Sequence, residues 1–447
     1  MNKINRPLLK RAFYGITMIF SMASIYLTAA AQEKPPGDID TSKYTPYATM
    51  MGHKVASSKF GEINIRIYTY VRYLNQLGLD SSYTDGFGKT QALDRRQDIQ
   101  LSKVSIYFAG WAFVPKLNYF LYVWTSNSSM GQGAQVVVAG NLTYNFNKHF
   151  KLLGGIASLP GVRSTEGNFP YWLSVDNRMI ADEYMRPSYT TGIEAKGEIV
   201  KKLNYLVMLG NNMSTLGVDA GQLDPKLNTL AAAVYYVPTT GEYGMFNGSY
   251  GDYDNHQKVA TRFGAHYTRS TETRQGQPNT DAFENVTLRV SDGSSIFTPN
   301  LFAPTVQIQQ ANDQMISLDG GAKYKGYALE GEYYWRKIDK FKVSSINPGS
   351  QLPFEELNDN GFQLLGSAMV FPKKLQLYTT YSKIFGQYGN PSELRVGFNF
   401  FPFKKTNSVR INTQVMFLDK CPVGGLAYPY TVGGNGVAYN VDFELNF

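Results

Sequence analysis

The chain has 447 residues, of which 43% are hydrophobic, and a mean hydropathy of −0.28. It is too polar for a bundle of membrane helices, and after residue 60 no stretch reaches the roughly 18 apolar residues that such a helix needs. Of the 43 Lys and Arg residues, four lie in the first 31 positions, which leaves 39 against 35 Asp and Glu. This near balance gives no reason to expect nucleic-acid binding. Cys421 is the only cysteine, so no internal disulfide can form.

Residues 1–31 are predicted to be a secretory signal peptide. Four basic residues precede the apolar run 16–28, and three alanines at 29–31 supply a cleavage site before Gln32. The alternative, a retained anchor helix, is disfavoured because the run is short. Residues 32–59 are polar and rich in turn formers, so we expect a flexible lead-in before a barrel domain at 60–447.

From residue 60 onward, apolar and polar residues alternate, which indicates extended strands whose two faces meet different surroundings. In the eight most regular segments no charge stands at an apolar-parity position. The opposite parity holds Arg66, Arg72, Arg262, Glu330, Glu332, Arg336, Arg395, Arg410, Asp442 and Glu444. A soluble sandwich also alternates, whereas in a membrane barrel a charge on the lipid side costs about 2–4 kcal/mol. Loop lengths distinguish the two.

Sixteen strands are predicted, and the connections between them alternate between short and long. The strands are 62–75, 98–110, 116–126, 134–146, 150–158, 190–198, 203–212, 229–237, 258–269, 315–324, 327–337, 361–371, 374–384, 392–401, 407–418 and 437–447. An even count with short turns at one end and long loops at the other is the pattern of outer-membrane barrels. Segment 238–257 breaks it, because it is long where a short turn is expected.

Several short turns place an aromatic residue before Pro and Lys, as in 113–116, 371–374 and 401–405. Aromatic rings settle at membrane interfaces and Lys extends beyond them to water, so an interfacial girdle is predicted, although Pro and Lys also simply suit turns. The last strand ends in Phe447, like the C-terminal signal by which the barrel-assembly machinery recognises outer-membrane barrels.

Four stretches carry a resemblance to a known family: "GEINIRIYTYVRYLNQ" at 61–76, "DIQLSKVSIYFAGWAF" at 98–113, "RMIADEYMRPSYTTGIEAKGEIVKKLNYLVMLGNN" at 178–212 and "DGGAKYKGYALEGEYYWRKI" at 319–338. They resemble the phosphate-selective porin O and P family. The resemblance implies a sixteen-stranded outer-membrane barrel of a Gram-negative bacterium, usually trimeric. Such a barrel passes small anions such as phosphate through a lumen that is narrowed by infolded loops and lined by Arg and Lys.

If the resemblance holds, loop 159–189 is the candidate constriction, with Arg163, Arg178 and Arg186 as candidate anion ligands, since Arg presents several donors in a fixed fork. The alternative is a surface loop whose arginines pair with its own acids, Glu166, Asp176, Asp182 and Glu183. The lumen parity adds nine basic residues: Arg66, Arg72, Lys103, Lys196, Arg262, Lys323, Arg336, Arg395 and Arg410. It also holds nine acids, Glu62, Glu194, Glu198, Asp319, Glu330, Glu332, Glu393, Asp442 and Glu444, which weakens an anion preference.

Other functions are less well supported. No serine stands in a G-x-S-x-G elbow, and His53, His149, His256 and His266 lack metal-ligand spacing, so neither catalysis nor a metal or cofactor is expected. "GDYDN" at 251–255 lacks calcium-loop spacing. A general porin remains an alternative, as does a plugged barrel that uses the long loop 270–314 as an adhesin or scaffold. The sequence leaves the solute and the number of associated barrels open.

Overall fold

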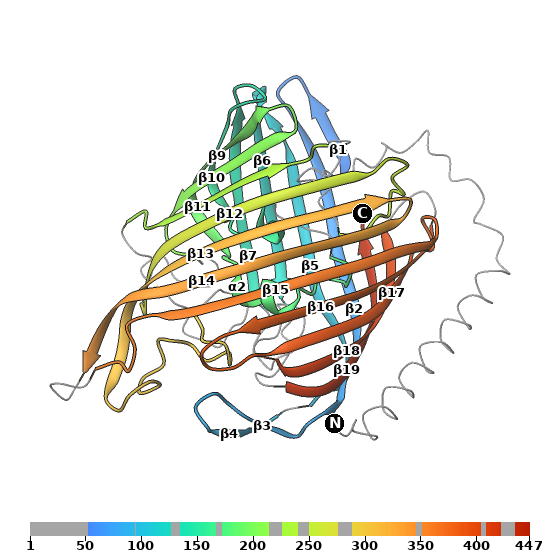
Figure 1. The fold of residues 1–447 in the computed structure, drawn as a ribbon. Coiled ribbons are helices and arrows are strands. Elements are labelled where there is room, and N and C mark those ends of the chain that lie inside the picture. The colour runs from blue at the N-terminus through green and yellow to red at the C-terminus, as the bar shows by residue number, and fades with distance from the viewer. Residues whose placement is uncertain are drawn as a thin grey trace.

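The computed structural model describes residues 52–93, 95–126, 135–166, 172–213, 226–239, 250–275, 288–345, 351–403, 408–421 and 434–447. The predicted signal peptide and the lead-in up to residue 51 lie outside these ranges. The described chain forms one antiparallel sheet that closes on itself as a barrel (Figure 1).

Sixteen strands make the barrel, each paired with its neighbour in the chain. They are β2 (Gly61–Leu79), β5 (Gln97–Ala112), β6 (Val114–Ser126), β7 (Gln135–Asn145), β8 (Lys151–Ser158), β9 (Tyr189–Val200), β10 (Leu203–Gly210), β11 (Thr229–Tyr236), β12 (Ala260–Thr273), β13 (Val306–Tyr324), β14 (Tyr327–Ser345), β15 (Leu357–Phe371), β16 (Leu375–Phe385), β17 (Ser392–Phe400), β18 (Val409–Cys421) and β19 (Gly434–Asn446). The barrel closes between β19 and β2, where Asp442 stands opposite Arg72. All sixteen predicted strands, and the closed all-β fold, are confirmed.

Two segments expected to be irregular are partly strands. The predicted lead-in includes β1 (His53–Ser58), which pairs antiparallel with the start of β2. The loop predicted at 270–314 is shorter, because β12 continues to Thr273 and β13 begins at Val306. The added parts of β12 and β13 extend the wall on the long-loop side, where β3 (Ser82–Thr84) and β4 (Thr90–Ala92) also form a small hairpin. Strand β1 lies at the short-turn end, beside the start of β2.

The predicted alternation of faces is confirmed. On β14 the outward Tyr327 and Leu329 are 67% and 68% exposed, whereas the inward Glu330 is 2% exposed. Exposed Ile, Leu, Val and Phe side chains recur around the outer wall, which is the arrangement of a barrel surrounded by lipid. Among the described residues, no helix has the length and apolar character needed to span a bilayer.

The centre of the barrel is partly filled by the chain itself. The segment between β8 and β9 carries η2 (Arg163–Thr165) and α2 (Ile180–Met185), and α2 lies inside the barrel (Figure 1). Its Val162, Ile180 and Tyr184 pack in one apolar cluster with inward residues of the wall, among them Met315 and Tyr334. Apolar inward residues of the wall therefore meet an infolded loop there instead of water.

Candidate functional site

The candidate constriction, predicted at 159–189, folds into the barrel between β8 and β9. Residues 167–171 lie outside the described part, but on both sides of them almost every residue is buried. The segment binds the wall from several directions. Ile180 donates its backbone N–H to Glu393 at 2.6 Å, and Ala181 donates to the hydroxyl of Ser382 at 3.0 Å. The loop is thus held by strands β16 and β17 as well as by apolar packing.

Inward arginines of the wall bind the backbone carbonyls of this segment. Arg72 Nη2 donates to the carbonyl of Val175 at 2.7 Å. Arg410 Nη1 donates to the carbonyl of Trp172 at 2.8 Å. Because a guanidinium has five N–H donors, each of these side chains can bind a carboxylate and a carbonyl together. These arginines therefore fasten the loop to the wall.

The predicted lumen-facing basic residues are, with few exceptions, paired with carboxylates. The pairs are Arg72 with Asp442 at 2.6 Å, Lys103 with Asp176 at 3.0 Å, Lys196 with Glu194 at 2.6 Å, Arg262 with Asp319 at 2.7 Å, Arg336 with Asp359 at 2.7 Å, Arg395 with Glu393 at 2.9 Å, and Arg410 with Glu444. Arg66 donates instead to the side-chain oxygen of Asn446 at 2.7 Å. Lys323 is buried near the short-turn end of β13. These pairs neutralise most of the positive charge that the sequence places in the lumen.

The three loop arginines agree in part with each of the two interpretations of the sequence, an inward constriction loop and a loop whose arginines pair with acids. The loop folds inward, as a constriction would, and yet its arginines pair with acids. Arg163 binds Glu330 of β14 at 2.8 Å, and Arg186 binds Glu183 at 2.8 Å. Arg178 lies 3.8 Å from a carboxylate oxygen of Asp182.

Loop carboxylates differ in their electrostatic surroundings. Burial alone would raise the pKa of Asp176, but the facing Lys103, Arg178 and Arg72 lower it below its ordinary value. Burial raises the pKa of Asp182 in spite of the nearby Arg178. Asp176 is thus a strong ion-pair partner at the loop edge, while Asp182 sits where a negative charge is disfavoured.

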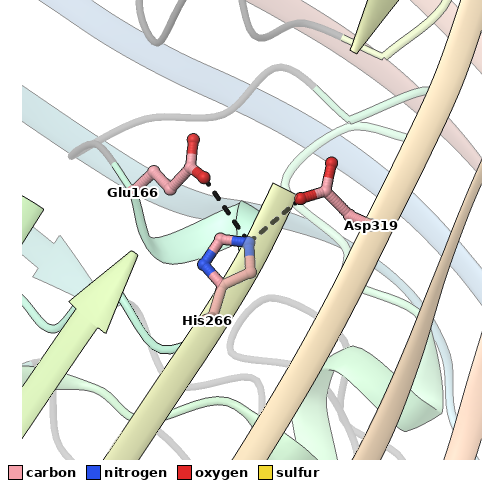
Figure 2. Close-up of side chains that lie close together, drawn as sticks. All are labelled: Glu166, His266 and Asp319. Carbon is pink, nitrogen blue, oxygen red and sulfur yellow. Dashed lines mark hydrogen bonds and ion pairs between the residues drawn. The ribbon is translucent and has the colours of Figure 1, made fainter. Parts of the chain in front are cut away.

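One titratable cluster joins the loop to the wall. His266 Nε2 lies 3.0 Å from Asp319 Oδ2 and 3.5 Å from Glu166 Oε1 (Figure 2). Arg262 binds both carboxylates, so a guanidinium already occupies the space between them. An imidazole and two carboxylates are possible ligands for a divalent cation, but the adjacent Arg262 supplies the positive charge itself. Its ion pairs link Glu166, the residue after η2, to Arg262 of β12, which also binds Asp319 of β13.

A second segment enters the lumen from the short-turn end. The turn between β11 and β12, which broke the predicted pattern, is an insertion whose described residues 250–257 reach the constriction. The Tyr250 ring lies 4.1 Å from the guanidinium carbon of Arg163, and Gly251 donates its N–H to Glu330 at 2.7 Å. Sequence analysis missed this role, and the only signal was the unexpected length of the segment.

The two halves of the lumen differ in exposure. On β12 to β19 the inward polar residues are almost all buried, with Gln414 and Asn440 fully so. On β5 to β9 several inward side chains keep contact with solvent: Lys103 is 15% exposed and Lys196 22%. Most inward residues of β5 to β9, among them Tyr107, Tyr122 and Asn141, are buried as well. The two halves therefore differ in a few partly exposed ionic side chains on β5 and β9.

Solved structures share this architecture. The chain is similar to OmpT of Vibrio cholerae, described as outer-membrane expressed, with a TM-score of 0.54 and 10% identity over 88% of this chain and all of that one. It is also similar to the outer-membrane channel DcaP of Acinetobacter baumannii, with a TM-score of 0.53 and 10% identity over 89% of this chain and all of that one. The trimer form of in-vitro folded OmpT gives a TM-score of 0.50 and 10% identity over 87% and 100% of the two chains.

This chain has the fold of an outer-membrane porin. No protein-family model matches it, and no curated protein matches its sequence. At about one residue in ten identical, the structural likeness concerns the fold alone. The porin-type barrel is confirmed, while the narrower resemblance to the phosphate-selective porins stays a prediction, as do the roles of the basic residues.

Proposed function

We propose that the protein is a channel in the outer membrane of a Gram-negative bacterium, through which small solutes diffuse passively. The observation that carries the proposal is a small set of ionic side chains on the inner faces of β5 and β9 that stay partly exposed beside the infolded loop. Lys103, Lys196 and Glu198 keep 15%, 22% and 23% of their side-chain surface accessible. A closed barrel with an apolar outer wall has lipid outside, so this inner strip is the path available to water.

We propose further that the channel discriminates weakly between anions and cations. A preference for phosphate or other small anions needs uncompensated positive charge at the narrowest point. Here the acids stand beside the bases, as Asp176 does beside Lys103 and Glu194 beside Lys196. The narrower hypothesis of a phosphate-selective pore depends on loop arginines keeping donors for a solute, and their ion pairs oppose this.

Planar-bilayer recording of the folded protein tests both statements. Stable open steps are expected, with a reversal potential near zero under a chloride gradient and no block by millimolar phosphate. A large anion-selective reversal potential together with block by phosphate would contradict weak discrimination and support a specific anion site. Absence of open steps from correctly folded protein would remove the channel itself.

A plugged barrel that serves as a scaffold is the second candidate. It is favoured by the apolar cluster that Val162, Ile180 and Tyr184 make with the wall.

The trimer form of a similar barrel supports a homotrimer as a further proposal. Recognition by the assembly machinery is supported by Phe447, whose side chain is 45% exposed on the outside of the barrel. Export by the predicted signal peptide completes this scheme.

A further inference from the structure

The outer wall carries an apolar groove that a smooth barrel would lack. It crosses β13 to β18, which lie side by side in Figure 1, and has a volume of about 1140 Å³. Gly366, Ala368 and Thr379 form its floor, between the larger Leu329 on one side and Phe398 on the other. A Cβ added to Gly366 would meet nothing closer than 3.9 Å, so the space above it is open.

The groove occupies one half of the apolar band. It starts at the short turns, beside Phe371 and Lys374, and continues along the strands past Gly366. About six residues at roughly 3.3 Å each, in strands tilted by about 40°, rise about 15 Å. The apolar band of an outer-membrane barrel is about 25 Å tall, so the groove is matched to the acyl chains of a single leaflet.

Basic residues stand at the turn end of this groove. Lys325, Lys373 and Lys374 follow directly on β13 and β15, and none has a carboxylate partner within 4 Å among the described residues. The aromatic rings of Tyr324 and Phe371, 41% and 54% exposed, lie at the same level. Aromatic rings and lysines at this depth mark the headgroup layer, where a cluster of cations attracts anionic lipid.

We propose that this groove is a binding site for an anionic glycerophospholipid of the leaflet on the short-turn side. The acyl chains lie over Gly366, Ala368 and Thr379, and Lys325, Lys373 and Lys374 bind the phosphate-bearing headgroup. The inference rests on the membrane placement in the proposed function, but not on whether the lumen conducts. A second barrel is the competing occupant of the groove.

Native mass spectrometry of the full-length folded barrel in detergent, with phosphatidylglycerol or phosphatidylcholine added, tests the site. Phosphatidylglycerol adducts are expected to outnumber phosphatidylcholine adducts. The triple variant K325Q/K373Q/K374Q is expected to lower phosphatidylglycerol binding about tenfold or more, and K325R/K373R/K374R to retain it. The matched control K59Q/K116Q/K201Q removes three exposed lysines from other short-turn positions and is expected to leave binding unchanged.

A second pair of variants tests the acyl-chain part. Gly366→Leu fills the floor and is expected to reduce the bound lipid several-fold. Gly320→Leu places the same side chain on the outer face outside the groove, where an added Cβ meets nothing nearer than 3.6 Å, and is expected to have no effect. Equal adducts in all variants would overturn the proposal. It would also be overturned by a lipid-free oligomer that only Gly366→Leu dissociates. Because the readout is lipid mass, a non-conducting barrel would leave the test intact.

Discussion

The two halves of the barrel interior are built on different principles. Against β12 to β19, arginines such as Arg395 and Arg410 bind a carboxylate and the loop backbone together, and the wall is dry. Along β5 to β9, ionic side chains such as Lys196 keep contact with solvent. A buried charge needs a partner, whereas an exposed charge does not. Arginines in the lumen therefore need not be solute ligands, because here they hold the infolded loop in place.

The turn end shows the same contrast. Inward residues at this level are buried on β18 and β19, where Arg410 is 6% and Glu444 3% exposed. At the matching level of β9, Glu198 keeps 23% of its side-chain surface exposed. On the buried side Arg410 donates to the carbonyl of loop residue Trp172, and Tyr250 of the second inward segment packs in a cluster with Leu173. The mouth is thus narrowed asymmetrically, which predicts a path off the barrel axis.

The largest effect is expected from Arg395→Ala in the packed half. Glu393, 1% exposed, would lose its cation, and the carbonyl of Asn177 would lose a donor. Breaking one side of a buried ion pair costs about 3–5 kcal/mol. The thermal unfolding midpoint in detergent should fall and the open-channel current should become larger and noisier. Lys148→Ala is the control, because Lys148 is 70% exposed beside the partly exposed Glu198, and its cost should be below about 1 kcal/mol. An equal decrease of the thermal unfolding midpoint in the two variants would contradict the difference between β12 to β19 and β5 to β9.

A smaller effect is expected from Tyr250→Ala. The ring packs on Arg163, and its loss should cost about 2–3 kcal/mol of local packing and cation–π attraction and free the second inward segment. Single-channel conductance should rise. Tyr253 lies in the same segment but packs on Phe401, with ring centroids 4.7 Å apart, and not on Arg163, so the conductance of Tyr253→Ala should match the wild type. A rise in both variants would mean that the segment acts without contacting the constriction.

The smallest effects concern selectivity. The double variant R72Q/D442N removes a buried pair and no net charge, so the reversal potential under a salt gradient should not move. Lys196→Gln removes an exposed charge and should lower the anion-to-cation permeability ratio by less than about fivefold, since a charge near water acts with only about 1 kcal/mol. A larger shift from the double variant than from Lys196→Gln would place the ion path in the packed half.

The strands were predictable because the alternation of apolar and polar residues is a local property of the sequence, as in the apolar Tyr439, Val441 and Phe443. Loop placement was not, because it depends on contacts between distant residues, such as Arg395 with the carbonyl of Asn177. The girdle was foreseen in part: Phe113 and Phe371 are 78% and 54% exposed, but Phe401 is buried against the second inward segment. Parity separated arginines such as Arg72 and Arg395, which are buried, from the exposed apolar face, but it could not show which carboxylate would meet each of them.

Cysteine accessibility during channel recording tests the central claim most directly. The native Cys421 is buried, so wild-type current should be insensitive to a charged methanethiosulfonate reagent. With Lys196→Cys the reagent should reduce the current in discrete steps. With Ser382→Cys, at a fully buried position that contacts the infolded loop, it should have no effect. Modification of Ser382→Cys but not of Lys196→Cys would contradict a water path along β5 to β9.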